Sequence, residues 1–390
     1  MVILLAPLAD SMEAIALALC ACYIGTVLLT FLFGRDLGGE RVGVIAAVLT
    51  ALSPHVLTYA TQPMTEMPFL CATMGALVLA RKSRWTYALG LALVSCTFRF
   101  IGVTLVGAVA IGALWEWKRP AAIIAPLLTV FAATLLLGVT GRFNLPLHSG
   151  PYGGDPITYW QLPVRIFNNA YAYLTQFGPH AVIPWRGSNL LAWSSAGFAV
   201  LVAAAVGLWR RDLVLSVYVP TYCGALLVWP EVLGGVRYLV PIIPLLLVGL
   251  ASLYRHLLPG ALIVAVLVIS LHVNRLVAKH GQPHPPNWPA YAALANDVRM
   301  THPPGDSLVI ACRKSSFFEV LSGHRAIGYP FAGPDTVMAF LDKEGATHAV
   351  VEKIGVNQPQ KFLQPAIDRH RDRFRKVLEY GPHTLYEVVR

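Results

Sequence analysis

The stretch YATQPMTEMPFL, residues 59–70, places a carboxylate, Glu66, between two long apolar runs. The runs at 43–60 and 65–80 are each close to the length and composition of a membrane-spanning helix. An ionised acid inside a bilayer costs several kcal/mol, so such residues are rare and usually have a functional role. Glu66 is therefore a candidate functional residue.

The composition is that of a membrane protein. Of the 390 residues, 56% are hydrophobic and 13% are charged, whereas about 25% are charged in a typical soluble domain. The charges are also concentrated toward the end of the chain: residues 275–390 hold 15 Lys/Arg and 11 Asp/Glu, against 15 and 9 in the much longer span 1–274. We predict a multi-span membrane domain over 1–274, a linker over 275–288 and a polar domain over 289–390.

Apolar segments of near-spanning length recur throughout the first part of the chain. Because several are shorter than the roughly 20 residues of a full crossing, tilted or partly buried helices are expected. The fold class predicted is a polytopic all-α membrane protein of about ten transmembrane helices, followed by a small C-terminal α/β extracytoplasmic domain. The segments are 13–34, 43–60, 65–80, 86–98, 100–116, 120–139, 190–209, 213–230, 238–254 and 257–274.

Basic residues in the breaks between these segments predict the topology. One alternating set of breaks contains ten Lys/Arg, whereas the other short breaks contain only Arg99 and Arg237. The positive-inside rule assigns the first set to the cytoplasm, in a multi-pass plasma (inner) membrane protein. The N-terminus, the 141–189 loop and the C-terminal domain are then external, and an upstream helix missing from this chain would explain the external start. The ten basic residues of the set assigned to the cytoplasm are Arg35, Arg41, Arg81, Lys82, Arg84, Lys118, Arg119, Arg210, Arg211 and Arg255.

This distribution also explains the net charge of +10 without a nucleic acid. The basic residues are divided among short breaks at the lipid boundary and form no continuous stripe that tracks phosphates. Within the 141–189 loop, apolar residues recur at helical spacing near 161–177, between Trp160 and Trp185. The pattern favours a helix lying on the outer leaflet, with a helix packed on other loops as the alternative.

The pattern changes in the C-terminal domain, where short apolar runs alternate with helical ones. Strands are predicted at 307–311, 326–330, 348–353 and 384–389. Helices are predicted at 315–323, 334–345 and 362–380. There is no glycine-rich nucleotide motif, no P-loop and no zinc or disulfide spacing of cysteines. No organic cofactor is expected, and the use of a divalent metal stays open.

Three stretches together resemble a known family. They are LFGRDLGGERVGVIAAVLTALSPHVLTYATQPMTEMPF (32–69), ALGLALVSCTFRFIG (88–102) and GGVRYLVPIIPLLLVGLASLY (234–254). In order and spacing they are similar to polytopic glycosyltransferases of the C-fold superfamily that use polyprenyl-phosphate sugars, such as protein O-mannosyltransferases and aminoarabinose transferases. The resemblance covers roughly 14–116 and 230–274. It implies a membrane glycosyltransferase with an external site, although the first helix and the acidic first external loop of the family are absent from this chain.

The resemblance implies a polyprenyl-phosphate-linked sugar as donor and an extracytoplasmic lipid, glycan or protein as acceptor. Such a reaction needs a base for the acceptor hydroxyl and positive charge for the lipid phosphate, which a forked arginine suits well. Predicted external helix ends supply both. Six residues are candidates: Glu66 as the catalytic group, Arg99, Arg237 and Tyr238 for the donor phosphate, and His55 and Asp155 as secondary candidates.

Each of these residues also has a simpler interpretation. Glu66 follows Thr65 at a helix start, where the helix dipole alone favours a carboxylate by about 0.3–1 kcal/mol. Arg99 and Arg237 are long enough to reach the phosphates of membrane lipids without any catalytic part, and Asp155 stands in the turn-forming sequence PYGGDP. Two other functions also remain open: a transporter or flippase of lipid-linked sugars, and an inactive truncated relative that acts as a binding or assembly protein.

Overall fold

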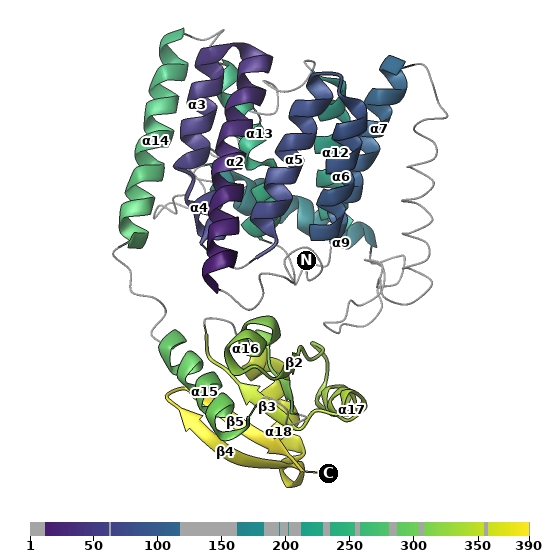
Figure 1. Ribbon diagram of the computed structural model, residues 1–390, viewed down its shortest axis with the longest axis vertical. Coiled ribbons are helices and arrows are strands. Elements are labelled where there is room, and N and C mark those ends of the chain that lie inside the picture. The colour runs from purple at the N-terminus through teal and green to yellow at the C-terminus, as the bar shows by residue number, and fades with distance from the viewer. Residues whose placement is uncertain are drawn as a thin grey trace. The chain divides into compact units, whose positions relative to one another are not determined.

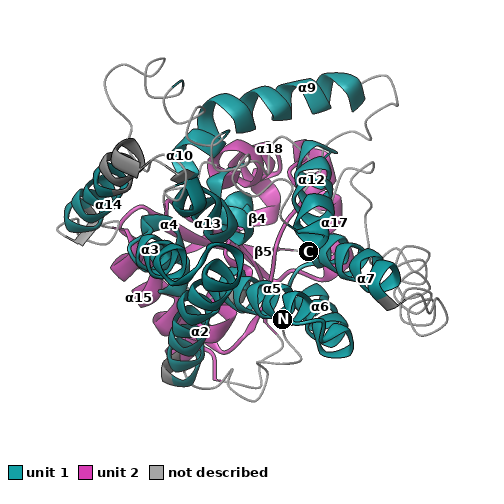
Figure 2. Cartoon of the chain, turned by 90° about the horizontal axis from the view of Figure 1, so that it is seen from above, with its two compact units in different colours: residues 1–143, 158–281 teal, residues 144–157, 282–390 magenta. Residues whose placement is uncertain are grey.

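The computed structural model describes residues 12–61, 64–117, 162–182, 212–228, 235–253, 258–280, 287–303, 308–354 and 358–389, with Ser195 and Val202. These residues form two compact units (Figure 2). The first unit draws its described residues from Met1–Phe143 and Thr158–Gly281, and the second draws them from Gln282–Arg390. The domain boundaries inferred from the sequence stay a prediction.

Unit 1 is helical in all its described elements (Figure 1). α5 packs on α2 and α6, and α7 packs on α6 and α12. The helices are α2 (Met12–Gly38), α3 (Glu40–Ala51), α4 (Pro54–Ala60), α5 (Glu66–Arg81), α6 (Trp85–Phe98), α7 (Val103–Trp117), α9 (Leu162–Ala172), α10 (Gly178–Val182), α12 (Leu213–Val228), α13 (Ile243–Leu253) and α14 (Leu258–His280), with the short segments η2 (Phe100–Gly102), η4 (Tyr173–Phe177) and η6 (Val236–Ile242).

Among the helices that the structure describes, fewer are long enough to span a bilayer than the sequence suggests. Among the described residues, two helical stretches, Ala14–Gly38 and Val236–Leu253, are long and apolar enough to cross a membrane. A third is added if a bent pair of helices counts as one span. The other apolar helices are shorter; α5, with 16 residues, rises about 24 Å against a hydrocarbon thickness of about 30 Å. The apolar segments at 120–139 and 190–209 lie outside the described residues.

The apolar segment predicted at 43–60 is not a single straight helix. α3 and α4 meet at an angle of 60°. Pro54 occupies the first turn of α4, and Ser53 before it adopts an extended conformation. Proline disfavours helical geometry in the residue that precedes it, so the helix axis breaks at this point. The break directs α4 toward η6.

Small residues allow α2 and α3 to pack closely. A Cβ atom on Gly43 would lie 2.6 Å from the carbonyl oxygen of Phe31, and one on Gly34 would lie 3.0 Å from the Cα of Gly43. Without such side chains, the two backbones approach each other at van der Waals distance, as in small-residue contacts between membrane helices. The sharp return between the helices uses Gly39, whose φ is +95°.

α9 confirms the helix predicted within the 141–189 loop. Its apolar residues Val164, Phe167 and Tyr171 are 59%, 70% and 60% exposed. An exposed apolar face on a helix suits the water–lipid boundary. The position of this helix on the outer leaflet stays a prediction.

Unit 2 is a three-layer α/β structure built on a five-stranded sheet of order β2-β1-β3-β5-β4. β1 pairs in parallel with β2 and β3, and β5 pairs antiparallel with β3 and β4. Alternate residues of β3 enter different cores: Ala349 and Val351 pack with α17 and α18, and Val350 packs with α15 and α16. The elements are α15 (Trp288–Thr301), β1 (Val309–Ala311), α16 (Ser315–Ser322), β2 (Arg325–Ile327), α17 (Pro334–Glu344), β3 (His348–Val351), η7 (Pro359–Leu363), α18 (Gln364–Arg369), η8 (Arg371–Arg373), β4 (Phe374–Tyr380) and β5 (His383–Val388).

The predicted strands are confirmed, but the helix predicted at 362–380 is wrong in its second half. Residues 374–380 form β4, an edge strand that pairs with β5 across a tight turn joining Tyr380 to His383. Gly381 in this turn has a φ of +54°, which favours glycine. The Arg, Lys, Leu and Glu residues of this segment favour a helix locally, and pairing with β5 overrides that preference.

We expect the C-terminal unit to fold without the membrane domain, because its described residues enclose two buried cores of their own. Residues 286–390 expressed alone should unfold in one cooperative thermal transition, followed by circular dichroism. A spectrum of an unfolded chain under native conditions would contradict this expectation.

Candidate functional site

The candidate site is centred on Glu66, the first residue of α5. The preceding residue, Thr65, is the N-cap of this helix, and its carbonyl oxygen accepts a hydrogen bond from the backbone N–H of Phe69. The Glu66 side chain is completely buried, at 0% exposure. A carboxylate this deeply buried requires compensating charge, so the favourable end of a helix dipole does not account for its position.

Two arginines from distant parts of the chain supply that charge. Nη1 of Arg99 donates to Oε1 of Glu66 over 3.3 Å, and Nε of Arg237 donates to the same oxygen. The other carboxylate oxygen, Oε2, is also buried and has no hydrogen-bond partner among the described residues. The structure thus brings together three residues that the sequence analysis selected.

Local backbone geometry positions both arginines. Arg99 lies between α6 and η2 in an extended conformation, with φ −148° and ψ 130°, so the helix ends and the side chain turns toward α5. Arg237 is the second residue of η6, directly after Gly235 and Val236. Gly235 has a φ of +153°, which a residue with a side chain rarely adopts.

Tyr238 completes the arrangement around Arg99. The guanidinium carbon of Arg99 lies 5.0 Å from the centre of the Tyr238 ring, within the range of a cation–π contact. The backbone carbonyl of Tyr238 accepts a hydrogen bond of 2.6 Å from the hydroxyl of Tyr222, which is fully buried in α12. Through this bond α12 fixes the start of η6 and hence the direction of Arg237.

The net charge of the cluster is positive. Glu66 contributes one negative charge and the two guanidinium groups contribute two positive charges, so one positive charge is left over. The Arg237 side chain is 41% exposed, whereas that of Arg99 is 13% exposed. Of the five N–H donors of Arg237, only the one on Nε bonds within the described residues. The cluster therefore presents an arginine fork to an anion, and phosphate oxygens match its geometry.

Two tyrosines belong to this site although the sequence analysis did not select them. Tyr222 acts through the carbonyl of Tyr238, and Tyr59 on α4 lies near Glu66 and both arginines. Tyrosines are common in apolar helices, so neither stands out in the sequence. Only the break between α3 and α4 brings Tyr59 toward η6.

Of the two secondary candidates, His55 and Asp155, the structure describes only His55. His55 lies one turn before Tyr59 on α4, and its Nε2 lies 3.0 Å from the carbonyl oxygen of His180. The two imidazole rings are 5.0 Å apart and nearly perpendicular. Asp155 lies outside the described residues, so its predicted role stays a prediction.

Among the described residues, no group of three or more His, Cys, Asp or Glu side chains is arranged to hold a metal ion. The donor set at Glu66 consists of one carboxylate and two guanidinium groups, and guanidinium groups repel a cation. This chemistry suits an anionic ligand.

No protein-family model matches the chain, and no curated protein matches it. Solved structures do resemble it. The chain superimposes on ArnT from Cupriavidus metallidurans bound to undecaprenyl phosphate with a TM-score of 0.54, at 13% sequence identity, covering 96% of this chain and 84% of that one. At this identity the similarity shows a shared fold.

Two further similarities are weaker. ArnT from Cupriavidus metallidurans in the apo state gives a TM-score of 0.46 at 12% identity, covering 95% of this chain and 83% of that chain. The Archaeoglobus fulgidus oligosaccharyltransferase in complex with Zn and sulfate gives 0.47 at 15% identity over 86% of this chain. This chain spans 56% of the length of the Archaeoglobus protein.

Proposed function

We propose that the chain is a membrane glycosyltransferase that moves a sugar from a polyprenyl-phosphate donor to a hydroxyl acceptor beside Glu66. The observation that carries the proposal is the buried Glu66 held by Arg99 and Arg237 with one positive charge left over. The fold shared with ArnT, solved with undecaprenyl phosphate, supports the same class of donor.

In this proposal the arginine pair binds the donor's phosphate. As the bond between the sugar carbon and the phosphate oxygen breaks, negative charge builds up on the departing phosphate. Guanidinium groups that are already oriented stabilise this charge without reorganising. Arg237, the more exposed of the two arginines, contacts the phosphate directly. Arg99, which is more buried, contributes its positive charge without direct contact.

Glu66 has two tasks in this mechanism. Its Oε1 accepts from both guanidinium groups and fixes their spacing. Its Oε2 is the oxygen with no partner among the described residues, and we assign it to the hydroxyl hydrogen of the acceptor. A carboxylate oxygen within hydrogen-bond reach orients that hydroxyl and takes its proton as the new glycosidic bond forms.

Replacing Arg237 with lysine tests the phosphate contact. Lysine keeps the charge and loses the planar fork that grips two oxygens at once. We expect the efficiency of sugar transfer from a polyprenyl-phosphate sugar to fall about tenfold, mainly through a higher KM for the donor.

Arg81→Lys is the matched control. Arg81 also forms an ion pair with an acidic residue, Asp212, at the far end of α5. Its variant should transfer sugar at the parental rate. If Arg237→Lys retains the parental KM, Arg237 does not hold the phosphate.

We also propose that the Glu66 end of α5 faces the outside, because the Arg81 end is followed by the basic sequence RKSRW. Lys82→Cys should react with a membrane-impermeant maleimide only after permeabilisation. Arg371→Cys, at a site 81% exposed in the C-terminal unit, should react in intact cells. The parent chain with its native cysteines gives the background. The reverse pattern would place the site in the cytoplasm.

A further inference from the structure

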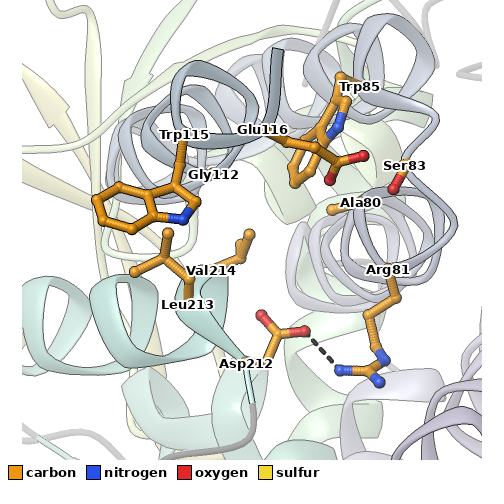
Figure 3. A pocket seen from close by; sticks show the side chains of 10 residues that line it. All are labelled: Ala80, Arg81, Ser83, Trp85, Gly112, Trp115, Glu116, Asp212, Leu213 and Val214. Atoms are coloured by element: carbon orange, nitrogen blue, oxygen red, sulfur yellow. Dashed lines mark hydrogen bonds and ion pairs between the residues drawn. The ribbon is translucent and has the colours of Figure 1, made fainter. Parts of the chain in front are cut away.

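A cavity lies at the opposite end of α5 from Glu66. It has a volume of about 500 Å³ and lies where the α5–α6 turn, the last turns of α7 and the start of α12 meet (Figure 3). The 16 residues of α5 separate its ends by about 24 Å. The cavity is therefore distinct from the proposed transfer site.

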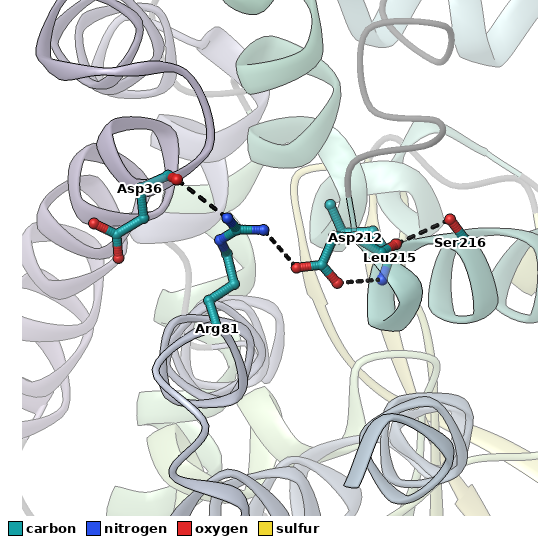
Figure 4. A network of polar contacts seen from close by, with 5 residues as sticks. All are labelled: Asp36, Arg81, Asp212, Leu215 and Ser216. Atoms are coloured by element: carbon teal, nitrogen blue, oxygen red, sulfur yellow. Dashed lines mark hydrogen bonds and ion pairs between the residues drawn. The ribbon is translucent and has the colours of Figure 1, made fainter. Parts of the chain in front are cut away.

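An ion-pair network holds one wall of this cavity in place. Nη1 of Arg81 donates to Oδ2 of Asp212 over 2.7 Å, and Nη2 donates to the carbonyl oxygen of Asp36 over 3.1 Å. Oδ1 of Asp212 accepts from the backbone N–H of Leu215 in the first turn of α12 (Figure 4). The network joins the ends of α2 and α5 to the start of α12, and Arg81 and Asp212 neutralise each other.

The opposite wall is formed by aromatic residues and one acid. Trp85 is 5% exposed, and its indole nitrogen is buried with no hydrogen-bond partner among the described residues. Gly112 makes room for it, because a Cβ there would lie 3.0 Å from the Trp85 ring. The Trp115 indole and the Glu116 carboxylate complete the lining (Figure 3). Glu116 has no ion-pair partner within the described part of the chain.

This lining favours a cation. With Arg81 and Asp212 paired, the carboxylate of Glu116 gives the cavity its net negative charge. The faces of indole rings also attract cations, and Trp does so most strongly of the aromatic residues. A primary ammonium suits the site better than a metal ion, because it contacts ring faces and still donates hydrogen bonds to a carboxylate.

The rim of the cavity has the properties of a lipid boundary. Trp115 is 79% exposed, and Ile111, one turn earlier on α7, is 44% exposed. Together they form an apolar track along which an acyl chain can lie, and Trp favours this depth of a membrane. Exposed Lys82 and Arg84 flank Ser83, which lines the cavity, so a phosphate at the rim meets positive charge.

We propose that this cavity binds the headgroup of an aminophospholipid, with its ammonium between Trp115, Trp85 and Glu116 and its phosphate near Lys82 and Arg84. Phosphatidylethanolamine has this chemistry, and free phosphoethanolamine has the same headgroup without the chains. The apolar track on α7 favours the lipid. This site does not depend on the proposed transfer reaction.

Lipid retention tests the proposal. The full chain is reconstituted in vesicles of equimolar phosphatidylethanolamine and phosphatidylglycerol, extracted in detergent, and its retained lipids are counted by native mass spectrometry. The parent should retain an excess of phosphatidylethanolamine. Glu116→Gln and Trp115→Leu should each reduce this excess about fivefold, since each removes one attraction for the ammonium.

Two variants outside the cavity are matched controls. Glu40→Gln removes an exposed acid at the start of α3, and Tyr87→Leu removes an aromatic that is 67% exposed on α6. Both should retain the parental lipid ratio. Preferential retention of phosphatidylglycerol by the parent, or parental retention by both cavity variants, would overturn the proposal.

A competition experiment distinguishes the two sources of the headgroup. Soluble phosphoethanolamine is added during extraction, and the retained lipid is counted again. Weak displacement, at concentrations far above that of the lipid, supports the lipid as ligand. Displacement at equal concentrations would show that the acyl chains add nothing to the binding affinity, and the assignment to a lipid would be wrong.

Discussion

Glu66→Gln is expected to reduce sugar transfer by about 10²-fold or more. The substitution keeps the volume of the side chain and removes its charge. Arg99 and Arg237, which share Oε1 of Glu66, would then face each other as two positive charges without a counter-ion. They would separate, and the two guanidinium groups proposed to bind the donor phosphate would lose the spacing that Oε1 gives them. The measurement is the rate of transfer from a polyprenyl-phosphate sugar.

The same substitution should also destabilise the membrane domain. Removing one partner of a buried ion pair costs about 3–5 kcal/mol, because the remaining charge stays buried. Asp212→Asn separates the two effects, since it removes the carboxylate partner of Arg81 at the other end of α5. We expect Asp212→Asn to lower thermal stability and leave transfer near the parental rate. A Glu66→Gln variant with parental turnover would show that Glu66 has only a structural role.

A double variant separates charge balance from catalysis. Glu66→Gln combined with Arg237→Gln removes one negative and one positive charge, so it should restore much of the lost stability. It should still transfer sugar poorly, since the phosphate contact and the carboxylate are both gone. Recovery of both stability and transfer would show that the cluster has only a structural role.

The sequence predicted Glu66, Arg99 and Arg237 because ionisable residues stand out in apolar surroundings. Their convergence follows from helix ends at one membrane depth, which the charge pattern predicts. The direction of each side chain depends on local backbone geometry: the extended conformation of Arg99 and the glycine before η6. No periodicity in the sequence encodes these features.

Other features could not be predicted from the sequence, for different physical reasons. Tyr222 belongs to the site through one hydrogen bond to a backbone carbonyl, and apolar helices often contain tyrosine. The cavity around Trp85 depends on Gly112, in a helix already rich in small residues. β4 has a helix-favouring composition, and its strand conformation depends on pairing with β5.

A second acid, Glu352, is buried in the C-terminal unit directly after β3. Its Oε1 accepts hydrogen bonds from the backbone N–H groups of Arg313 and Lys314, just before α16. The side chain is fully buried, and Oε2 has no hydrogen-bond partner among the described residues. Burial raises the pKa of Glu352 from 4.5 to about 7, although the two N–H groups and the Arg313 charge act in the opposite direction.

Of the groups around Glu352, the tyrosines and the cysteine do not change charge in the same pH range, whereas two histidines do. Burial raises the pKa of Tyr291, Tyr329 and Cys312 above their ordinary values, so all three are neutral near pH 7. Burial lowers the pKa of two histidines, His348 and His383. Their folded forms bind protons less readily than the unfolded chain, so their contribution to stability increases with pH, opposite to that of Glu352.

Because the folded-state pKa of Glu352 is raised, its contribution to stability is lost as pH increases. Below 4.5 the carboxyl group is protonated in both states. Between 4.5 and about 7 the unfolded chain releases the proton and the folded chain keeps it, so the free energy of unfolding falls. Above that range the carboxylate is ionised in both states, and the full loss, roughly 3 kcal/mol, persists.

Glu352→Gln should therefore stabilise the C-terminal unit by roughly 3 kcal/mol near pH 8 and by almost nothing near pH 4. Glutamine keeps an oxygen for the two backbone N–H groups and has no charge to bury. The measurement is urea unfolding of residues 286–390 with and without the substitution at each pH. The difference between variant and parent cancels the contribution of the histidines, which is the same in both. Glu319→Gln, which removes an exposed acid on α16, should show no such pH dependence. If Glu352→Gln destabilises the unit near pH 8, the ionised carboxylate gains more from Arg313 and the N–H groups than it loses by burial.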